Sequence, residues 1–350
     1  MGKITTVGID LAKNVFSVHA IDEAGAIVLR RTLTRAQLPA AVAQWPACVI
    51  GIEACSGAHD WARRFRHFGH TVRIMAPRFV APYRKSGKND GNDAEAICEA
   101  VQRPNMRFVP VKSVEQQAVL ALHRVRHGFV EERTATINRI RGLLAEFGVV
   151  RAHDARHVRH AATAAAEALP VLARRCIDDL RDHLRDLDER IAAYDKELDR
   201  LARGDEAVVR LMGIAGVGTL TASATVASVG AAHEFANGRQ FAAWLGLTPK
   251  QWSTGGKSRL GHITKRGDPY LRNLLVMGAR AVLQMATRRN DKMSRWALAL
   301  KERRGYHRAA VAIAGRMPAS CGRCWPAKPR SRRLEARNDR QLPWRLRIAR

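Results

Sequence analysis

The stretch ITTVGIDLAKNVFSVHAIDEAGAIVLRRTL, residues 4–33, sets the fold of the N-terminal part of the chain. It holds three apolar runs, at 4–9, 15–21 and 26–33, and the turn residues Asp22 and Gly25 separate the last two. Short apolar runs bounded by turn residues predict β-strands. We therefore expect a three-stranded meander, whose first strand ends at Asp10.

The segments that follow alternate between helix and strand. Residues 35–45 and 58–68 have helical patterns, whereas CVIGIEA (48–54) and TVRIMAP (71–77) read as strands, the first of them buried. The order βββαβαβ predicts an α/β fold in which helices flank a mixed sheet. Such sheets commonly place working residues at strand ends, where the scaffold is rigid and the side chains stay accessible.

Long helices are predicted for residues 113–203. In the second helix, apolar residues are spaced alternately by three and four, a heptad pattern that predicts a coiled coil. Its partner is either a helix of the same chain, with Ile137, Ile140, Leu144 and Phe147 on the facing side, or the equivalent helix of a second subunit. We favour a hairpin that also contributes to dimerisation. The heptad positions are Ile177, Leu180, Leu184, Leu187, Ile191, Tyr194, Leu198 and Leu201.

A third, mainly helical region begins near residue 207. Its segment LMGIAGVGTLTASATVASVG (211–230) resembles a helix-hairpin-helix turn, in which glycines let backbone N–H groups approach phosphate; a plain interhelical turn is the alternative. Residues 241–283 then predict a loop rich in Gly, Lys and Arg, followed by an apolar helix. A loop of this composition is suited to binding phosphate.

The charge of the chain predicts a polyanionic partner. The 350 residues, enough for about two domains, contain 60 Lys and Arg against 32 Asp and Glu, a formal net charge of +28. At 46% hydrophobic residues the chain has the composition of a folded protein, which excludes a purely disordered basic tail as the source of the charge. No apolar run approaches 18 residues, so we expect no membrane partner and a cytoplasmic, nucleoid-associated protein.

The last 36 residues, 315–350, differ from the rest of the chain. They carry 11 basic residues and four Pro without clear periodicity, which predicts a disordered or frameshifted tail. Without it, residues 1–314 keep an excess of +19, so the prediction of a nucleic-acid partner does not depend on the tail.

Four acidic residues are candidate metal ligands. Asp10 and Glu53 end predicted neighbouring strands, while Asp90 and Asp93 open a predicted helix. Clustered carboxylates repel one another unless cations lie between them, and oxygen ligands suit Mg²⁺. Two such ions support phosphodiester chemistry. The alternative is that Asn92 or Asp93 is an ordinary helix N-cap and Asp90-Gly91 an ordinary turn. Lys13, Lys85 and Lys88 are neighbours suited to phosphate.

Several motifs resemble those of one known family. GIDLAKN (8–14), GIEACSG (51–57), KNDGNDAEAI (88–97), MGIAGVGTLTA (212–222) and WLGLTPKQWSTGGKSRLGHITKRGDPYLRNLL (244–275) resemble the DEDD transposases of insertion sequences, which are RNA-guided recombinases. The resemblance covers residues 3–314 in consistent order. It implies an RNase H-like, RuvC-related catalytic domain at 1–110, a coiled-coil region at 111–204, and a transposase domain at 205–314 that bears a serine.

The resemblance also implies the site. Asp10, Glu53, Asp90 and Asp93 correspond to the Mg²⁺ ligands, and Ser253 to a nucleophile that forms a phosphoserine link to DNA, with Thr254 as the alternative. A serine alkoxide that attacks a phosphodiester needs its proton removed and the developing charge neutralised. Because Mg²⁺ held by the acids can do both, the two domains are expected to meet, in one subunit or across two. Lys257, Arg259, Lys265 and Arg266 in the same motif are expected to contact nucleic acid.

The implied partners are the DNA of the element and its target, a structured guide RNA, and further copies of the chain as a dimer or tetramer. Base pairing to the RNA would then select sequence, while the protein reads backbone shape and charge. Two other functions stay open at this point. One is a decayed transposase that binds nucleic acid without catalysis, and the other is an actin-like ATPase or sugar kinase. Actin-like ATPases and sugar kinases normally have Gly and a hydroxyl residue after the Asp that ends the first strand. This chain has Ala12, Lys13 and Asn14 there, which argues against that function.

Overall fold

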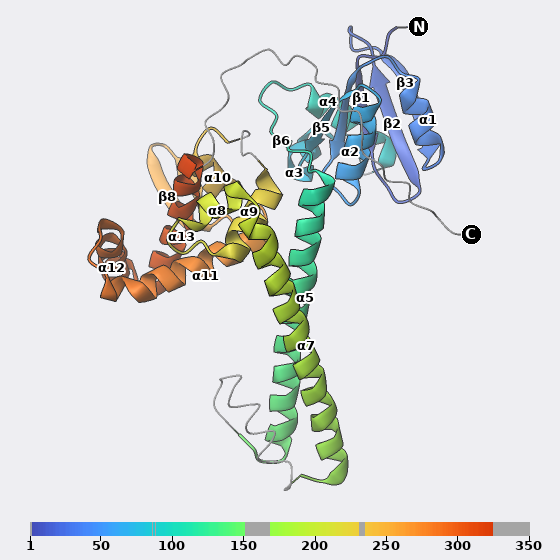
Figure 1. The fold of residues 1–350 in the computed structure, drawn as a ribbon. Helices are drawn as coiled ribbons and strands as arrows, with labels where there is room; N and C mark the ends of the chain where they lie inside the picture. Colours follow the sequence, from blue (N-terminus) through green and yellow to red (C-terminus); the bar gives the residue numbers. More distant parts are fainter. Residues whose placement is uncertain (1, 86, 88, 151–168, 231–234, 325–350) are drawn as a thin grey trace.

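A computed structural model describes residues 2–85, 87, 89–150, 169–230 and 235–324, with the side chains of 319–324 left out. The described chain forms three parts (Figure 1): an N-terminal domain of residues 2–110, a stalk made of two long helices, and a C-terminal domain that begins at residue 205. The predicted mixed α/β sheet followed by helices is confirmed. Of the predicted basic tail, residues 325–350 lie outside the described residues, as does Lys88.

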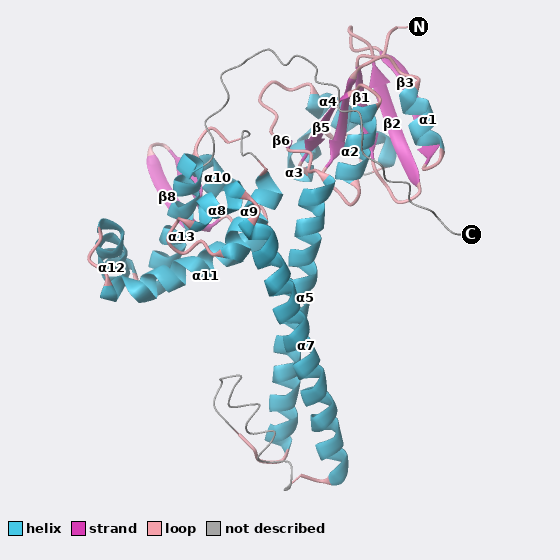
Figure 2. Ribbon diagram, viewed as in Figure 1, coloured by secondary structure: helices cyan, strands magenta, loops and turns pink. Residues whose placement is uncertain are grey.

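The N-terminal domain is built on a six-stranded sheet with the order β3-β2-β1-β4-β5-β6. The meander of β1, β2 and β3 is antiparallel, and β4 and β5 continue it in parallel to β1, as Figure 2 shows. Every strand predicted for this sheet is present within two residues of its expected ends, and within this sheet the short β6 escaped prediction. The strands are β1 (Thr6–Asp10), β2 (Val15–Ile21), β3 (Ile27–Thr34), β4 (Val49–Glu53), β5 (Thr71–Met75) and β6 (Phe108–Val109).

Helices cover both faces of this sheet. On β1, Val7 and Ile9 point into the core formed with α1 and α2, which also buries Trp61 and Phe65. The alternate residues therefore point to the opposite face, where α4 crosses β2, β1 and β4. The helices of this domain are α1 (Gln37–Ala43), α2 (Ala58–His67), α3 (Pro77–Val80), the 3₁₀ turn η1 (Ala81–Tyr83) and α4 (Asp90–Val101).

Glycine allows α4 to lie directly on the sheet. A Cβ atom at Gly8 would lie 2.2 Å from the backbone oxygen of Ala94, and one at Gly51 would lie 2.9 Å from Cβ of Val101. Real side chains do not tolerate such distances, so α4 approaches this closely because positions 8 and 51 have no side chain. The residues two positions further along β1 and β4 are Asp10 and Glu53, which consequently share the face covered by α4.

The stalk is a hairpin of α5 (Val114–Glu146) and α7 (Val171–Arg203). A capping box of Ser113 and Gln116 starts α5. All eight heptad residues of α7 are buried or half-buried, and Ile137, Ile140 and Leu144 of α5 pack against them. The prediction for Phe147 was wrong, because it caps the C-terminal end of α5 and is 44% exposed. The prediction of a hairpin within one chain is thus confirmed, whereas a supercoil and a role in dimerisation stay predictions. Polar contacts also join the two helices: Arg133 forms an ion pair with Asp188, and Nε2 of His183 lies 2.9 Å from Oε1 of Glu132.

The C-terminal domain packs its helices around one core that includes Leu211, Phe241, Leu275 and Ile313. The turn between α8 and α9 brings Gly216 onto α11, since a Cβ at Gly278 would lie 1.9 Å from the Gly216 oxygen. Phosphate binding by this turn remains a prediction. The elements are α8 (Glu206–Met212), α9 (Thr219–Val229), α10 (Gly238–Trp244), β7 (Pro249–Thr254), β8 (Lys257–Ile263), α11 (Pro269–Met285), η2 (Ala286–Arg288), α12 (Lys292–Arg304) and α13 (Tyr306–Cys324).

Helix α13 continues past residue 314, although composition predicts that an atypical tail begins at residue 315. Met317 is 2% exposed and belongs to the core of the C-terminal domain. The helix contains Pro318, which lacks a backbone N–H, yet the helical conformation extends to Cys324. The fold of the domain therefore includes at least the first residues of the segment that composition alone separates from it.

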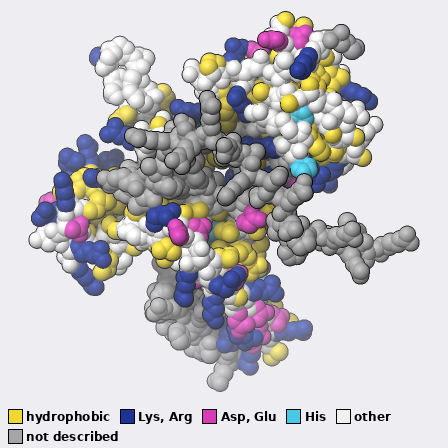
Figure 3. All heavy atoms as spheres, turned by 45° about the horizontal axis from the view of Figure 1, so that its top comes forward, with side chains coloured by type: hydrophobic (Ala, Val, Ile, Leu, Met, Phe, Trp, Pro, Cys, Tyr) yellow, Lys and Arg dark blue, Asp and Glu magenta, His cyan; other side chains and the backbone are white. Residues whose placement is uncertain are grey.

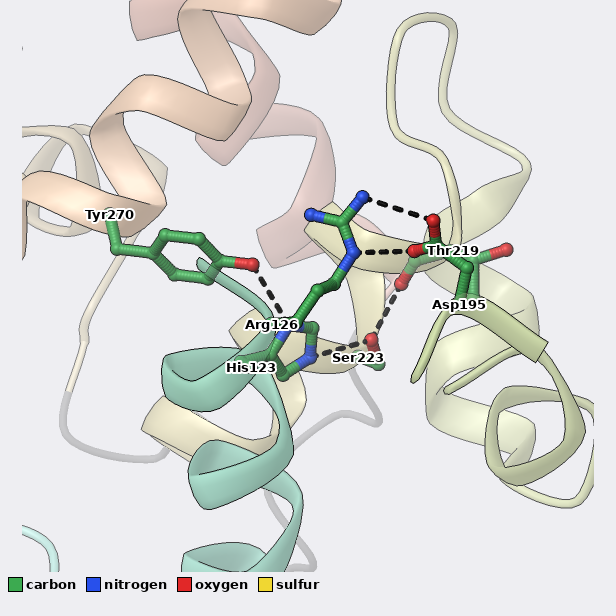
Figure 4. A network of polar contacts seen from close by, with 6 residues as sticks. All are labelled: His123, Arg126, Asp195, Thr219, Ser223 and Tyr270. Carbon is green, nitrogen blue, oxygen red and sulfur yellow. Dashed lines mark hydrogen bonds and ion pairs between the residues drawn. The ribbon is translucent and has the colours of Figure 1, made fainter. Parts of the chain in front are cut away.

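A buried polar network fixes the C-terminal domain to the stalk (Figure 4). Nε2 of His123 lies 3.0 Å from Oγ of Ser223, and its Nδ1 lies 3.0 Å from the hydroxyl of Tyr270. Ser223 donates its own proton to the carbonyl of Thr219, so it accepts from Nε2 of His123, and Tyr270 donates to Nδ1. Beside it, Arg126 of α5 binds Asp195 of α7 at 2.5 and 3.2 Å.

Candidate active site

Asp10 and Glu53 lie side by side at one edge of the sheet. Strands β1 and β4 are parallel and pair Ile9 with Ile52, so each of the next residues ends its strand at the same level. Both acids are half-buried and lie on the face that α4 covers. The strand-end arrangement that the sequence predicts for these two carboxylates is therefore present in the fold.

The thiol of Cys55 lies close to both acids. Burial raises its pKa above the usual value, and the negative charges of Asp10 and Glu53 raise it further. Cys55 also approaches the carbonyl of Leu11, at 3.9 Å. The thiol thus stays protonated near neutral pH, and the electrostatic potential at this edge of the sheet is negative, as a cation site requires.

The other two acids are on α4, which begins at Asp90. The N-cap is Asn89, whose side chain accepts a hydrogen bond from the N–H of Asn92 at 2.8 Å, so neither Asn92 nor Asp93 caps the helix. Asp90, in the first turn, is exposed. Asp93 is 9% exposed and forms an ion pair with Arg84, whose Nε lies 2.5 Å from Oδ1.

No group of three or more His, Cys, Asp or Glu side chains among the described residues is arranged to hold a metal ion. The guanidinium of Arg84 takes the position of a cation beside Asp93. The donor set nevertheless fits Mg²⁺ in its chemistry, since all four side chains offer oxygen and two share one sheet edge. Arg84 was not among the predicted site residues. It is one of several basic residues before α4, and nothing in the sequence distinguishes it from its neighbour Lys85.

The predicted basic neighbours of the acids have partners of their own. Lys85 donates to Glu95 on α4 at 2.8 Å, and its side chain is 75% exposed. That hydrogen bond is the main reason why the pKa of Glu95 is lowered. Lys13 is exposed after β1. Contact of these residues with nucleic acid stays a prediction.

The segment that carries Ser253 is a β-hairpin rather than the predicted loop. Strands β7 and β8 pair Ser253 with Ser258 and Thr254 with Lys257, and the turn between them is Gly255-Gly256 with φ values of +54° and +76°. Two successive glycines with positive φ form the tight turn that matches strand twist. The prediction of a loop from the Gly, Lys and Arg content was wrong, because two glycines with positive φ let the flanking residues pair as strands.

The hairpin is exposed except at Ile263, the last residue of β8, which packs against the core of the C-terminal domain. Ser253 Oγ accepts a hydrogen bond from Nε2 of Gln251 at 2.8 Å, while Thr254 points to the opposite face of the strand. Trp252 is 61% exposed and Leu260 66%. In Figure 1 the hairpin projects from the C-terminal domain on the side away from the sheet. The predicted nucleophile and the acids are thus on separate elements.

Basic side chains surround the hairpin. Lys257, Arg259, Lys265 and Arg266 are exposed. Figure 3 shows Lys and Arg side chains spread over the visible face of all three parts of the molecule. This distribution agrees with the polyanionic partner that the net charge predicts.

A mixed sheet with acids at adjacent strand ends, joined to a basic helical domain, is consistent with the RNase H-like class of enzymes that act on nucleic acids. Comparison with known proteins identifies the family. A transposase profile named for the DEDD motif and IS110 matches residues 7–149, and the profile "Transposase IS116/IS110/IS902 family" matches residues 208–295.

Curated relatives match most of the chain. A probable family 20 transposase of Pseudomonas aeruginosa is 48% identical over 318 residues, covering 89% of this chain and 94% of the relative. The transposase for insertion sequence element IS1111A of Coxiella burnetii is 44% identical, with 90% and 88% covered. That for IS1328 of Yersinia enterocolitica is 39% identical, with 91% and 95% covered. The chain belongs to the IS116/IS110/IS902 family of transposases, and it is an enzyme of DNA transposition.

Proposed function

We propose that this transposase cuts and rejoins DNA strands in a Mg²⁺-dependent reaction that uses Asp10, Glu53, Asp90 and Asp93 together with Ser253. The observation that carries the proposal is the register of β1 and β4, which brings Asp10 and Glu53 to one sheet edge. These two residues would hold the metal. Asp93 would join them by exchanging Arg84 for the cation, and Asp90 would approach from the first turn of α4.

Ser253 is the proposed nucleophile. Its Oγ attacks a phosphorus atom of the DNA, an Oγ–P bond forms, and the P–O bond to one deoxyribose breaks. The serine loses its hydroxyl proton, and the oxygen released on that sugar gains a proton to become a hydroxyl. Bound Mg²⁺ would supply neutralisation of the phosphate charge. Attack of a strand's hydroxyl on the phosphoserine link reverses the step and joins the new strand.

The hairpin suits a nucleophile that must reach a substrate. Its strands have no covering element among the described residues, and Gln251 orients the Ser253 hydroxyl. Thr254 is the alternative nucleophile. We further propose that an element-encoded guide RNA pairs with the DNA and that the protein acts as a dimer or tetramer. The excess of basic residues supports a nucleic-acid partner without distinguishing RNA from DNA.

A denaturing gel tests this function. Purified protein is mixed with Mg²⁺, RNA transcribed from the region that flanks the gene, and labelled DNA across the element's junction. Wild-type protein should give a covalent protein–DNA band. Ser253→Ala should lose it, whereas Ser258→Ala, on the paired position of the same hairpin, should keep it. Loss in Thr254→Ala alone would assign the nucleophile to Thr254.

Asp10→Asn separates catalysis from binding in the same assay. It should abolish cleavage while leaving nucleic-acid affinity unchanged, and Glu23→Gln at an exposed position should affect neither. Loss of binding together with cleavage in Asp10→Asn would indicate a structural role for Asp10. Retention of RNA binding without cleavage in wild-type protein would favour the decayed, binding-only function.

A further inference from the structure

A cavity of about 500 Å³ lies between the N-terminal and C-terminal domains, and we call it the interdomain cleft. One wall consists of residues that follow β5 and residues around β6. The other wall consists of residues from α10, from the end of α9 and from both ends of the β7–β8 hairpin. The side chains on which the argument depends are Arg78, Phe79, Arg107, Phe108, Trp244 and Arg266.

Aromatic rings line both walls of the interdomain cleft. Phe79, Phe108 and Trp244 are half-buried, so each has a face or edge that is not packed in a core. Trp244 is held by Phe241, with ring centroids 5.8 Å apart and planes 24° from parallel. The guanidinium of Arg73 lies 4.8 Å from the centre of the Phe108 ring. These contacts hold Trp244 and Phe108 in place, and the guanidinium of Arg78 lies 4.7 Å from the centre of the Phe79 ring.

Three arginines carry the charge of the cleft. Arg78, Arg107 and Arg266 line it, and none of its described lining residues is acidic. Burial lowers the pKa of Arg78, and repulsion from Arg266 and Arg107 lowers it further. Positive groups that repel one another across a cavity are stabilised by an anion placed between them. The charges therefore indicate an anionic occupant.

The cleft lies between the carboxylate edge and the base of the hairpin that carries Ser253. On one side, Ala76 directly follows Met75, which pairs with Glu53 across β5 and β4. On the other side, Thr264 and Arg266 follow β8 of the hairpin that carries Ser253. A strand that runs from the carboxylate edge to the base of the hairpin would pass along this cleft.

We propose that the interdomain cleft binds an unpaired nucleotide of the DNA strand being cut, with its base against the aromatic rings and its phosphate between the arginines. The cavity volume lies within the range of small-ligand pockets. Aromatic side chains combined with a basic groove are the means by which proteins hold single strands, because an unpaired base has a free π-face. The inference rests on the proposed strand-cutting function, because that function brings a DNA strand to the carboxylate edge beside the cleft.

The charge of the cleft is tested with Arg78→Gln/Arg107→Gln in the full-length protein. Binding of a labelled single-stranded DNA oligonucleotide is measured over a range of salt concentrations. Each lost phosphate contact should reduce the slope of log K against log salt by about 0.7. The control is Arg175→Gln/Arg203→Gln, which removes the same charge from exposed positions of the stalk and should leave the slope unchanged.

Stacking is tested with 2-aminopurine placed at successive positions of the oligonucleotide. Wild-type protein should quench its fluorescence at one position. Phe79→Leu, with folding checked by circular dichroism, should restore fluorescence and weaken binding roughly five- to hundredfold. Unchanged quenching in this variant would contradict the stacking role even if the charge variants behave as expected.

Three further outcomes would overturn the proposal. The double arginine variant could bind as the stalk control does, or wild-type protein could fail to bind single strands. The variants could also weaken binding of RNA of the same sequence and leave DNA binding intact, which would assign the cleft to RNA. Failure of the proposed function is recognised by a different result, namely that Asp10→Asn and Ser253→Ala retain cleavage.

Discussion

At His123, burial and hydrogen bonding select the neutral imidazole. The side chain is 1% exposed, and burial, with a smaller contribution from Arg126, lowers its pKa to about 4. Protonation would place a second N–H against the hydroxyl that Tyr270 already donates. His59, at the junction of α2 and the stalk, has its pKa lowered to about 4 mainly by burial and also by Lys112. Both joints between the domains and the stalk thus contain a histidine held neutral.

The stability of the joints should fall in mild acid. Because the folded-state pKa of His123 is below the unfolded value of 6.5, the unfolded chain binds more protons between pH 6.5 and pH 4. Stability is full above pH 6.5 and is lost as pH falls toward 4, by at most about 3 kcal/mol for this residue. Urea unfolding at several pH values measures the loss.

His123→Gln supplies the comparison for this pH dependence. Glutamine retains a donor and an acceptor but does not titrate, so the variant should be less stable at pH 7 and should lose less stability on acidification. His67→Gln, at an exposed position, should follow the wild-type curve. Identical slopes for wild type and His123→Gln between pH 6.5 and 4 would contradict the assignment.

At the scale of elements, the position of α4 depends on Gly8. Gly8→Ala should destabilise the protein by about 1–3 kcal/mol, because its Cβ would meet backbone atoms of Ala94 and Cys98 and α4 would have to shift. The same shift would move Asp90 and Asp93 relative to Asp10. We therefore expect the cleavage activity to fall by a larger factor than the loss of folded protein explains. Thermal unfolding and the cleavage gel measure the two effects.

Gly128 is the matched control on α5. No atom lies within 4 Å of a Cβ built there, and the residue is in a helix interior. Gly128→Ala should therefore stabilise the protein by about 0.5–1 kcal/mol. If Gly8→Ala and Gly128→Ala changed the free energy of unfolding equally, the close contact between α4 and β1 would not be what excludes a side chain at position 8.

At the scale of the whole molecule, the serine hairpin and the carboxylate edge belong to different domains. The buried network of His123 holds the C-terminal domain on the stalk, and Arg63 of α2 holds the N-terminal domain there through hydrogen bonds to Gln117 and the carbonyl of Lys112. Bringing Ser253 to Asp10 within one chain would disturb these joints. An oligomer that pairs the hairpin of one subunit with the carboxylates of another would not.

Mixing two inactive variants tests this arrangement. If sites form across subunits, Asp10→Asn and Ser253→Ala protein refolded together should recover part of the strand-cutting activity, since one site per mixed pair has both groups intact. If each site forms within one chain, the mixture should remain inactive. Asp10→Asn mixed with Glu53→Gln is the control, because both changes remove the same half of the site and no recovery is expected.

Local patterns in the sequence were enough to predict most of the helices and strands of this protein. Apolar runs and turn residues located the first five strands, and the heptad pattern located the second stalk helix, because local periodicity reports which face of an element is buried. The acids at the ends of β1 and β4 followed from the same pattern. Family motifs supplied Ser253 and the DEDD assignment, which periodicity cannot provide.

Contacts between residues of different elements became known from the folded chain alone. The ion pair of Asp93 with Arg84, the His123 network and the interdomain cleft join residues that are far apart in the chain or have no periodic pattern. Their energies depend on burial and on distances between elements, which sequence spacing does not encode. The partner of α7 was also settled in this way, since its heptad face fits a helix of the same chain or of another equally well.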